Sequence, residues 1–127
     1  MNYYFEGLQH IGIPTKKYQE TQRFYTNLGF TLAHENRTPS GENVCFLKNG
    51  SLILEVYESE DASGSDGAVN HFALDSTDIE KSYAAACGDG QKILSNGIES
   101  LNFWENGVKF FIIEGPNAER VEFCQKL

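Results

Sequence analysis

Apolar and polar positions in the first half of the chain predict a strand, a helix and three more strands. Residues 8–13 form a short apolar run before Pro14, which is typical of a strand that ends at a turn. Across residues 16–28 the apolar side chains recur at helical spacing, and Gly29 follows where a left-handed residue ends many helices. The next strands are predicted at residues 30–34, 44–47 and 51–57, with a turn at Asn49-Gly50. The predicted order is βαβββ.

The second half restarts the same pattern after a loop rich in acidic residues, glycine and serine at residues 58–67. Residues 69–74 read as a short apolar strand, and Thr77-Asp78-Ile79-Glu80 reads as a capping box that opens a helix ending at residues 88–90. The strands that follow are predicted at residues 92–94, 101–104, 108–113 and 121–124. Leaving out the weak strand at residues 92–94, this half is also predicted to be βαβββ.

A single constant offset along the sequence aligns equivalent residues of the two halves. It brings His10 onto His71, Tyr18 onto Ile79, and Gly29 onto Gly90. The first strand, the helix and the end of the helix all coincide, so the sequence predicts an internal structural duplication.

The length of the chain indicates how many domains it forms, and its net charge limits the kinds of partner that it can bind. The 127 residues suit one domain, and 18 acidic against 10 basic residues give a net charge of −8. Such a surface repels nucleic acid and anionic membranes, so we expect no nucleic acid and no membrane as partners. The chain opens with neither the basic region nor the apolar stretch of a signal peptide, so we expect a cytoplasmic protein.

The three cysteines are far apart in the sequence and include no CxxC pair, so we expect them to be small buried hydrophobic residues.

Four side chains carry the candidate chemistry. His10 and His71 lie at equivalent positions within apolar first strands, and Glu55 and Glu122 lie within apolar later strands. Each histidine alone could be a hydrogen-bonded core residue, and each glutamate could point to solvent from a half-exposed strand. If the strands of each half curl around one face, two imidazoles and two carboxylates suit a divalent first-row metal.

Several segments resemble one known family, the vicinal oxygen chelate superfamily, which includes glyoxalase I, bleomycin resistance proteins and extradiol dioxygenases. The resemblance extends over about residues 7–125 and is most specific in Phe24-Tyr25-Thr26-Asn27-Leu28-Gly29-Phe30. The other matching segments are Leu8-Gln9-His10-Ile11-Gly12-Ile13, Leu54-Glu55-Val56, Asn70-His71-Phe72-Ala73-Leu74 and Arg120-Val121-Glu122-Phe123.

The resemblance implies an α+β fold in which two βαβββ modules form an open barrel-like cleft. A single domain is expected over residues 1–127, with module one at about 7–58 and module two at about 69–125. The family also implies a small-molecule substrate, one divalent transition metal (nickel, cobalt, manganese, iron or zinc) and a homodimer. The implied metal ligands are His10, Glu55, His71 and Glu122.

This ligand pattern is most similar to that of glyoxalase I, lactoylglutathione lyase. It implies a metal-dependent lyase or isomerase that moves a proton next to a carbonyl through a metal-stabilised enediolate, with Glu122 as the base and Glu55 as its partner on the opposite face. Two alternatives stay open: a non-catalytic small-molecule binding protein of the bleomycin-resistance kind, and a dioxygenase or thiol transferase on the same fold. Residues placed by their strands to line the cleft, or else to pack the core, are Phe46, Phe103, Trp104 and Phe111. His34 is expected at the surface.

Overall fold

The computed structural model describes residues 3–4, 6–65, 67 and 69–127. The chain divides into two compact units, residues 1–62 and 63–127, and each is described by itself. Within the connecting loop predicted at residues 58–67, Asp66 lies outside the described residues. None of the helices formed by the described residues is long and apolar enough to cross a bilayer.

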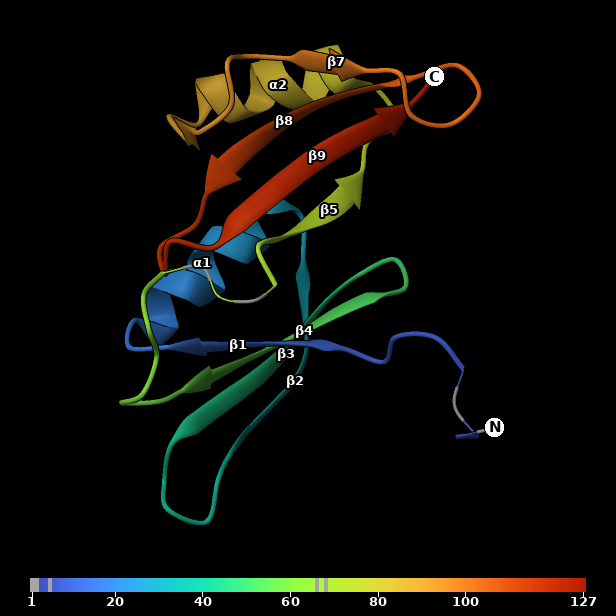
Figure 1. The fold of residues 1–127 in the computed structure, drawn as a ribbon. Coiled ribbons are helices and arrows are strands. Elements are labelled where there is room, and N and C mark those ends of the chain that lie inside the picture. The colour runs from blue at the N-terminus through green and yellow to red at the C-terminus, as the bar shows by residue number, and fades with distance from the viewer. Residues whose placement is uncertain (1–2, 5, 66, 68) are drawn as a thin grey trace. The chain divides into compact units, whose positions relative to one another are not determined.

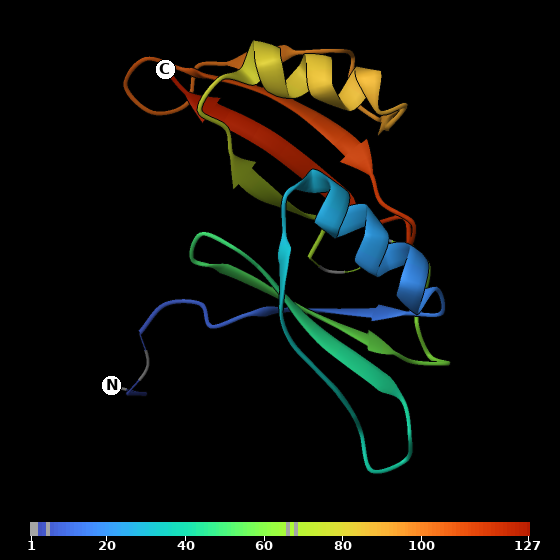
Figure 2. The same cartoon turned by 180° about the vertical axis from the view of Figure 1, so that it is seen from behind.

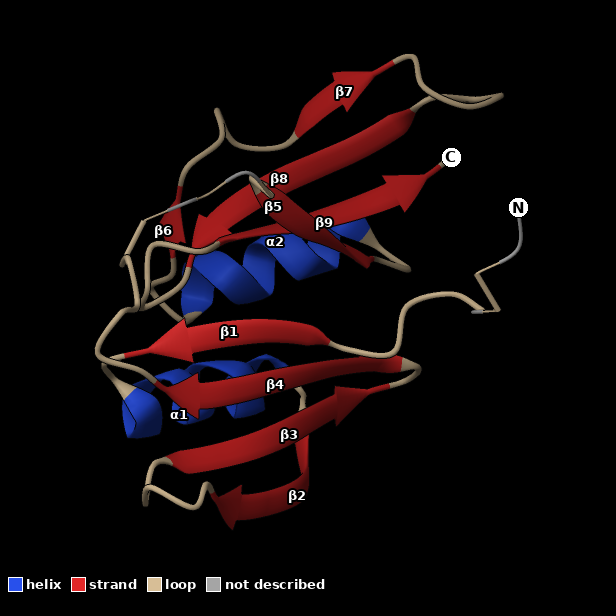
Figure 3. Ribbon diagram, turned by 60° about the horizontal axis from the view of Figure 1, so that its bottom comes forward, coloured by secondary structure: helices blue, strands red, loops and turns tan. Residues whose placement is uncertain are grey.

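The first unit is the predicted βαβββ module. Its elements are β1 (Ile11–Thr15), α1 (Tyr18–Leu28), β2 (Thr31–Arg37), β3 (Asn43–Asn49) and β4 (Leu52–Glu58). The strands form one sheet in the order β1-β4-β3-β2, with β1 parallel to β4 and the other pairs antiparallel (Figure 3). The first strand starts later than predicted and runs through Pro14. Proline is tolerated there because β1 is an edge strand.

The second unit repeats this topology (Figure 1). Its elements are β5 (His71–Asp75), α2 (Ile79–Gly88), β6 (Lys92–Ile93), β7 (Glu99–Leu101), β8 (Val108–Glu114) and β9 (Arg120–Lys126). The sheet order is β5-β9-β8-β6, and β7 pairs with β8 as well. Short strands β6 and β7 pair with opposite ends of β8, so together they take the place that β2 has in the first unit. The strand predicted at residues 101–104 is wrong beyond Leu101, because Trp104 has a left-handed φ of 60°.

Helix α1 covers one face of the first sheet (Figure 2). It packs mainly on β3 and β4, and the strand alternation puts the fully buried Leu54 and Val56 on that face. The same alternation turns Glu55, which lies between them, to the opposite face. Gly29 ends the helix with φ +113°, as predicted, and lets Phe30 pack 5.6 Å from the Tyr25 ring.

Helix α2 covers one face of the second sheet in the same way (Figure 2). The Tyr83 ring meets the Phe111 ring edge-on at 5.2 Å, and Phe111 stacks on Phe123 at 4.9 Å. The predicted capping box is displaced by one residue. The N-cap is Asp78, whose carboxylate accepts the Lys81 backbone N–H at 3.1 Å.

A β-bulge in β2 changes which side chains reach each face of the first sheet. The register with β3 shifts between Leu32 and His34, which leaves Ala33 unpaired. Beyond the bulge His34 pairs with Phe46, and Glu35 pairs with the buried Cys45. The bulge therefore turns His34 to the face away from α1 and Glu35 toward the helix.

Candidate functional site

The four predicted ligands lie on the sheet faces opposite the helices, two in each unit. The histidines stand at strand starts rather than mid-strand as predicted: His10 directly precedes β1, and His71 is the first residue of β5. Both are partly exposed, with 35% and 44% of the side chain accessible. The alternative that these histidines are buried core residues is therefore wrong.

The first unit brings His10 and Glu55 together. His10 Nε2 lies 3.6 Å from Glu55 Oε1. The parallel pairing of β1 with β4 sets Gly12 opposite Glu55, and a Cβ at Gly12 would lie 3.7 Å from the same carboxylate oxygen. The Phe46 ring meets the His10 ring edge-on at 5.9 Å. Imidazole, carboxylate and one aromatic ring thus share this face.

The second unit brings His71 and Glu122 together with nearly the same geometry. His71 Nε2 lies 3.7 Å from Glu122 Oε1. Here Ala73, two residues after the histidine, is the small residue that pairs with the glutamate. Each repeat therefore presents one imidazole nitrogen to one carboxylate oxygen.

The other nitrogen of each imidazole is held by the preceding residue. His10 Nδ1 lies 3.0 Å from Gln9 Oε1, and His71 Nδ1 lies 3.0 Å from Asn70 Oδ1. An amide oxygen only accepts hydrogen bonds, so Nδ1 carries the proton in both rings. Nε2 is then the ring nitrogen that faces the glutamate. Sequence reasoning missed Gln9 and Asn70, although a carboxamide residue precedes each histidine at the same repeat offset.

These donors fit a divalent metal. Imidazole nitrogen and carboxylate oxygen bind such ions at about 2.1 Å, so two ligands of one ion lie at most about 4.2 Å apart. The separations of 3.6 and 3.7 Å meet that condition, and both exceed a normal hydrogen bond. Histidine ligands also commonly donate their second N–H to a neighbouring oxygen, as both do here. No group of three or more His, Cys, Asp or Glu side chains among the described residues is arranged around a metal position, so each unit shows two candidate ligands.

The four aromatic residues predicted to line the cleft have different surroundings. Phe46 lies on the face of the first pair, with the His34 ring 6.1 Å away on its other side. Phe111 is fully buried under α2 and packs the core, so its assignment to the cleft is wrong. Phe103 and Trp104 are exposed in the loop before β8, and Lys126 Nζ lies 3.9 Å from the centre of the Trp104 ring.

The cysteines depart in part from the prediction of buried hydrophobic residues. Cys45 is fully buried, Cys124 is half-buried and Cys87 is exposed. Burial raises the pKa of the Cys124 thiol, and the nearby Glu122 carboxylate adds to that effect. A neutral thiol thus lies beside the second pair.

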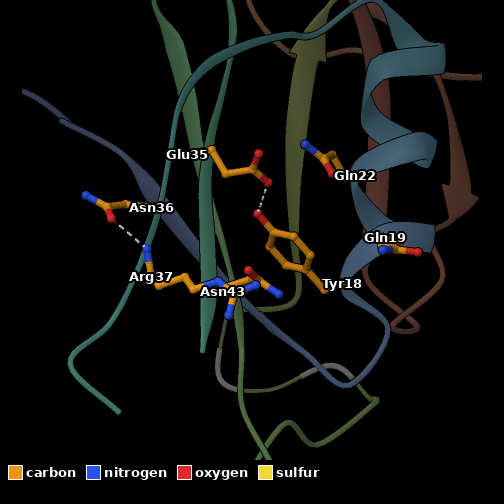
Figure 4. Close-up of a pocket in the computed structure, with 7 residues that line it drawn as sticks. All are labelled: Tyr18, Gln19, Gln22, Glu35, Asn36, Arg37 and Asn43. Atoms are coloured by element: carbon orange, nitrogen blue, oxygen red, sulfur yellow. Dashed lines mark hydrogen bonds between the residues drawn. The ribbon is translucent and has the colours of Figure 1, made fainter. Parts of the chain in front are cut away.

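A polar pocket of about 450 Å³ lies on the helix side of β2 in the first unit (Figure 4). Its lining residues are Tyr18, Gln19, Gln22, Glu35, Asn36, Arg37 and Asn43. The Tyr18 hydroxyl donates a 2.7 Å hydrogen bond to Glu35 Oε2, and burial raises the pKa of Tyr18 well above its usual range. Sequence reasoning missed this pocket because it depends on the β2 bulge, for which the apolar pattern carries no signal.

Comparison with known proteins agrees with this architecture. Protein YwbC of Bacillus subtilis is 35% identical over 74 residues, covering 58% of this chain and 55% of YwbC. The chain spans less than two thirds of the curated relatives it matches. A glyoxalase family protein from Enterococcus faecalis is 25% identical, with a TM-score of 0.78 over 95% of this chain and 98% of that one.

The fosfomycin resistance protein FosX of Listeria monocytogenes, complexed with Mn(II) and sulfate, has the same fold. Its TM-score is 0.73 at 13% identity, over 97% of this chain and 94% of that one. The model of the glyoxalase/bleomycin resistance protein/dioxygenase superfamily matches residues 7–123, nearly the whole chain. The resemblance found in the sequence is thereby confirmed, and the chain belongs to this superfamily.

Proposed function

We propose that the protein is a metal-dependent lyase or isomerase of the glyoxalase type that moves a proton on a carbon next to a carbonyl. The supporting observation is the repeated pair of imidazole and carboxylate, with separations of 3.6 and 3.7 Å at equivalent positions of the two modules. A protein that only encloses a ligand has no need of two matched pairs of imidazole and carboxylate. Membership of a superfamily that contains enzymes supports the same proposal.

The ligands of one divalent ion in this proposal are His10 and Glu55 of the first module and His71 and Glu122 of the second. The complex of FosX with Mn(II) supports manganese as one of the metals to test, beside nickel, cobalt, iron and zinc. When bound, such an ion polarises the oxygens of a substrate and makes the neighbouring C–H bond more acidic.

The chain's own groups handle the proton. Glu122 is the proposed base, because its carboxylate faces the open side of the sheet while its side chain is only 16% exposed. It takes the proton from the carbon next to the carbonyl. In a hemithioacetal the proton is returned to the neighbouring carbon, and in a 2-substituted acyl thioester it is returned to the same carbon on the opposite face. Glu55 is the proposed partner for the opposite face of the substrate, and Phe46 excludes water beside it. The family resemblance also supports a homodimer, which sedimentation equilibrium tests.

Elemental analysis after dialysis of the intact, untagged chain tests the metal. The proposal expects close to one equivalent of a transition metal, lost in the double variant His10→Ala/His71→Ala and retained in His34→Ala. His34 is a fair control because it lies on the same sheet face as His10 and forms no ion pair with any of the described residues. Absence of metal, with no uptake of added nickel, manganese or zinc, would falsify the proposal and favour a non-catalytic binding protein.

Isomerisation of hemithioacetals and of 2-substituted acyl thioesters tests the chemistry. We expect chelator to abolish activity and added metal to restore it. Glu122→Gln should lower kcat by about 100-fold or more, the usual contribution of a positioned base. A metal-loaded protein that turns over neither substrate class, or a Glu122→Gln variant of unchanged kcat, contradicts the assigned reaction.

A further inference from the structure

The polar pocket beside β2 is distinct from the face that carries His10 and Glu55. Because α1 packs mainly on β3 and β4, the edge strand β2 is left uncovered, and a hollow remains between them. Glu35 and Arg37 lie two residues apart on β2 and so share the face toward the helix. Figure 4 shows both side chains extending to the side of Tyr18, whereas Asn36 points away from it.

The pocket has the negative charge of Glu35 at one end and the positive charge of Arg37 at the other, and these two groups do not form an ion pair with each other. Among the described residues, neither the Glu35 carboxylate nor the Arg37 guanidinium forms an ion pair. Tyr18 occupies one oxygen of Glu35, which leaves Oε1 available. Guanidinium groups bind carboxylates through two parallel hydrogen bonds, so Arg37 is suited to an anionic group.

The pocket is partly preorganised for such a ligand. Tyr18 is only 8% exposed, and its hydroxyl holds the Glu35 carboxylate in one place. The bulge at Ala33 is what turns Glu35 to this side, and bulges are frequent where a strand must redirect a binding side chain. Gln22 directs its amide toward the space beside Glu35, and Asn43 lies beside Arg37 (Figure 4). These amides supply neutral donors and acceptors between the two charges.

We propose that this pocket binds a small zwitterion of amino-acid or dipeptide size, with its ammonium group on Glu35 and its carboxylate on Arg37. The volume of about 450 Å³ lies within the range of small-molecule sites and exceeds what a single simple ion fills. A ligand with one charge leaves the other protein charge unpaired. An anion alone is further disfavoured by the net charge of −8.

Titration of the intact ¹⁵N-labelled chain with glycylglycine, followed by NMR, tests the pocket. We expect saturable shifts of the backbone amide signals of Gln22, Glu35 and Arg37. N-acetylglycine lacks the ammonium group and glycinamide lacks the carboxylate, so each should bind at least about tenfold more weakly, the usual cost of losing one charged hydrogen bond. Glycylglycine that produces no saturable shift, or that binds no better than both controls, overturns the proposal.

Variants locate the binding. Glu35→Gln removes the negative charge but keeps an oxygen that can accept the hydrogen bond of the Tyr18 hydroxyl. Arg37→Gln removes the guanidinium. Each should weaken glycylglycine binding at least about tenfold. Matched controls on α1, Glu20→Gln and Arg23→Gln, lie outside the pocket lining and should bind like the parent. Binding by Glu35→Gln or Arg37→Gln equal to the parent contradicts the assignment. The variant His10→Ala/His71→Ala should bind unchanged, which separates this proposal from the metal site.

Discussion

At the scale of single residues, the hydrogen bonds that orient the two imidazoles give the metal proposal its sharpest support. Gln9 and Asn70 differ in length, yet each places an amide oxygen 3.0 Å from Nδ1 of the histidine that follows. Two different side chains that achieve the same contact in both repeats indicate a requirement for the tautomer, because only that tautomer leaves Nε2 free to bind a metal.

Replacing these amides should therefore disturb the histidines and weaken metal binding. In Gln9→Leu and Asn70→Leu, long-range ¹H–¹⁵N NMR of the metal-free protein should show His10 or His71 losing its Nδ1–H preference. Metal affinity should fall by about 10- to 100-fold, as found when a ligand's hydrogen-bond partner is removed. The exposed residue Gln19 provides a control in Gln19→Leu. An unchanged tautomer in both variants contradicts the assigned role.

Tyr18 makes folding stability depend on alkaline pH. Burial raises the pKa of its hydroxyl above the ordinary value of 10.0, so the unfolded chain releases this proton first as the pH rises. The stabilisation is therefore fully present below pH 10 and is lost as the pH rises through the folded-state pKa. Urea unfolding at pH 9 and pH 11 should show a smaller fall of the unfolding free energy in Tyr18→Phe than in the parent. Equal falls would show that Tyr18 is not the titrating group.

At the scale of elements, the sequence predicts helices and strands that depend on local residue preferences, but it does not predict features that depend on how neighbouring strands pair. The helix ending at Gly29 and the buried strand around Leu54 were predictable, because spacing and glycine preference are local properties. The division between β6 and β7 and the bulge at Ala33 were not predictable, because both depend on the register with a neighbouring strand.

The turn after α1 gives a stability test of that local chemistry. Gly29 has φ +113°, where an L side chain is strained, so Gly29→Ala should lower the unfolding free energy by about 1 kcal/mol or more. Gly88 is the matched control, because it lies at the end of α2, and an added Cβ there meets no atom within 4 Å. Gly88→Ala should be neutral or slightly stabilising, since alanine is favoured in helices. Urea denaturation of both variants makes the comparison, and equal stabilities would contradict it.

At the scale of the whole molecule, duplication made the site residues visible in the sequence. No local motif joins His10 to Glu55 or His71 to Glu122, and only the repeat picks out the equivalent histidines. The 3.6 and 3.7 Å contacts could not be predicted, because they require each glutamate to turn away from its helix, which strand register decides. The burial of Phe111 could not be predicted either, because an aromatic residue in a strand is compatible with the core and with a cleft.

The duplication also leads to a prediction of how many metal ions the two pairs of histidine and glutamate bind. If both pairs hold one ion, the parent binds one equivalent per chain, and His10→Ala and His71→Ala each weaken binding by at least about 100-fold. The double variant should then bind more weakly than either single variant, because it keeps only the two carboxylates as ligands of that ion. Separate ions on the two pairs would instead give two equivalents in the parent and one in each single variant. Isothermal titration with nickel or manganese distinguishes these cases, and His34→Ala should match the parent throughout.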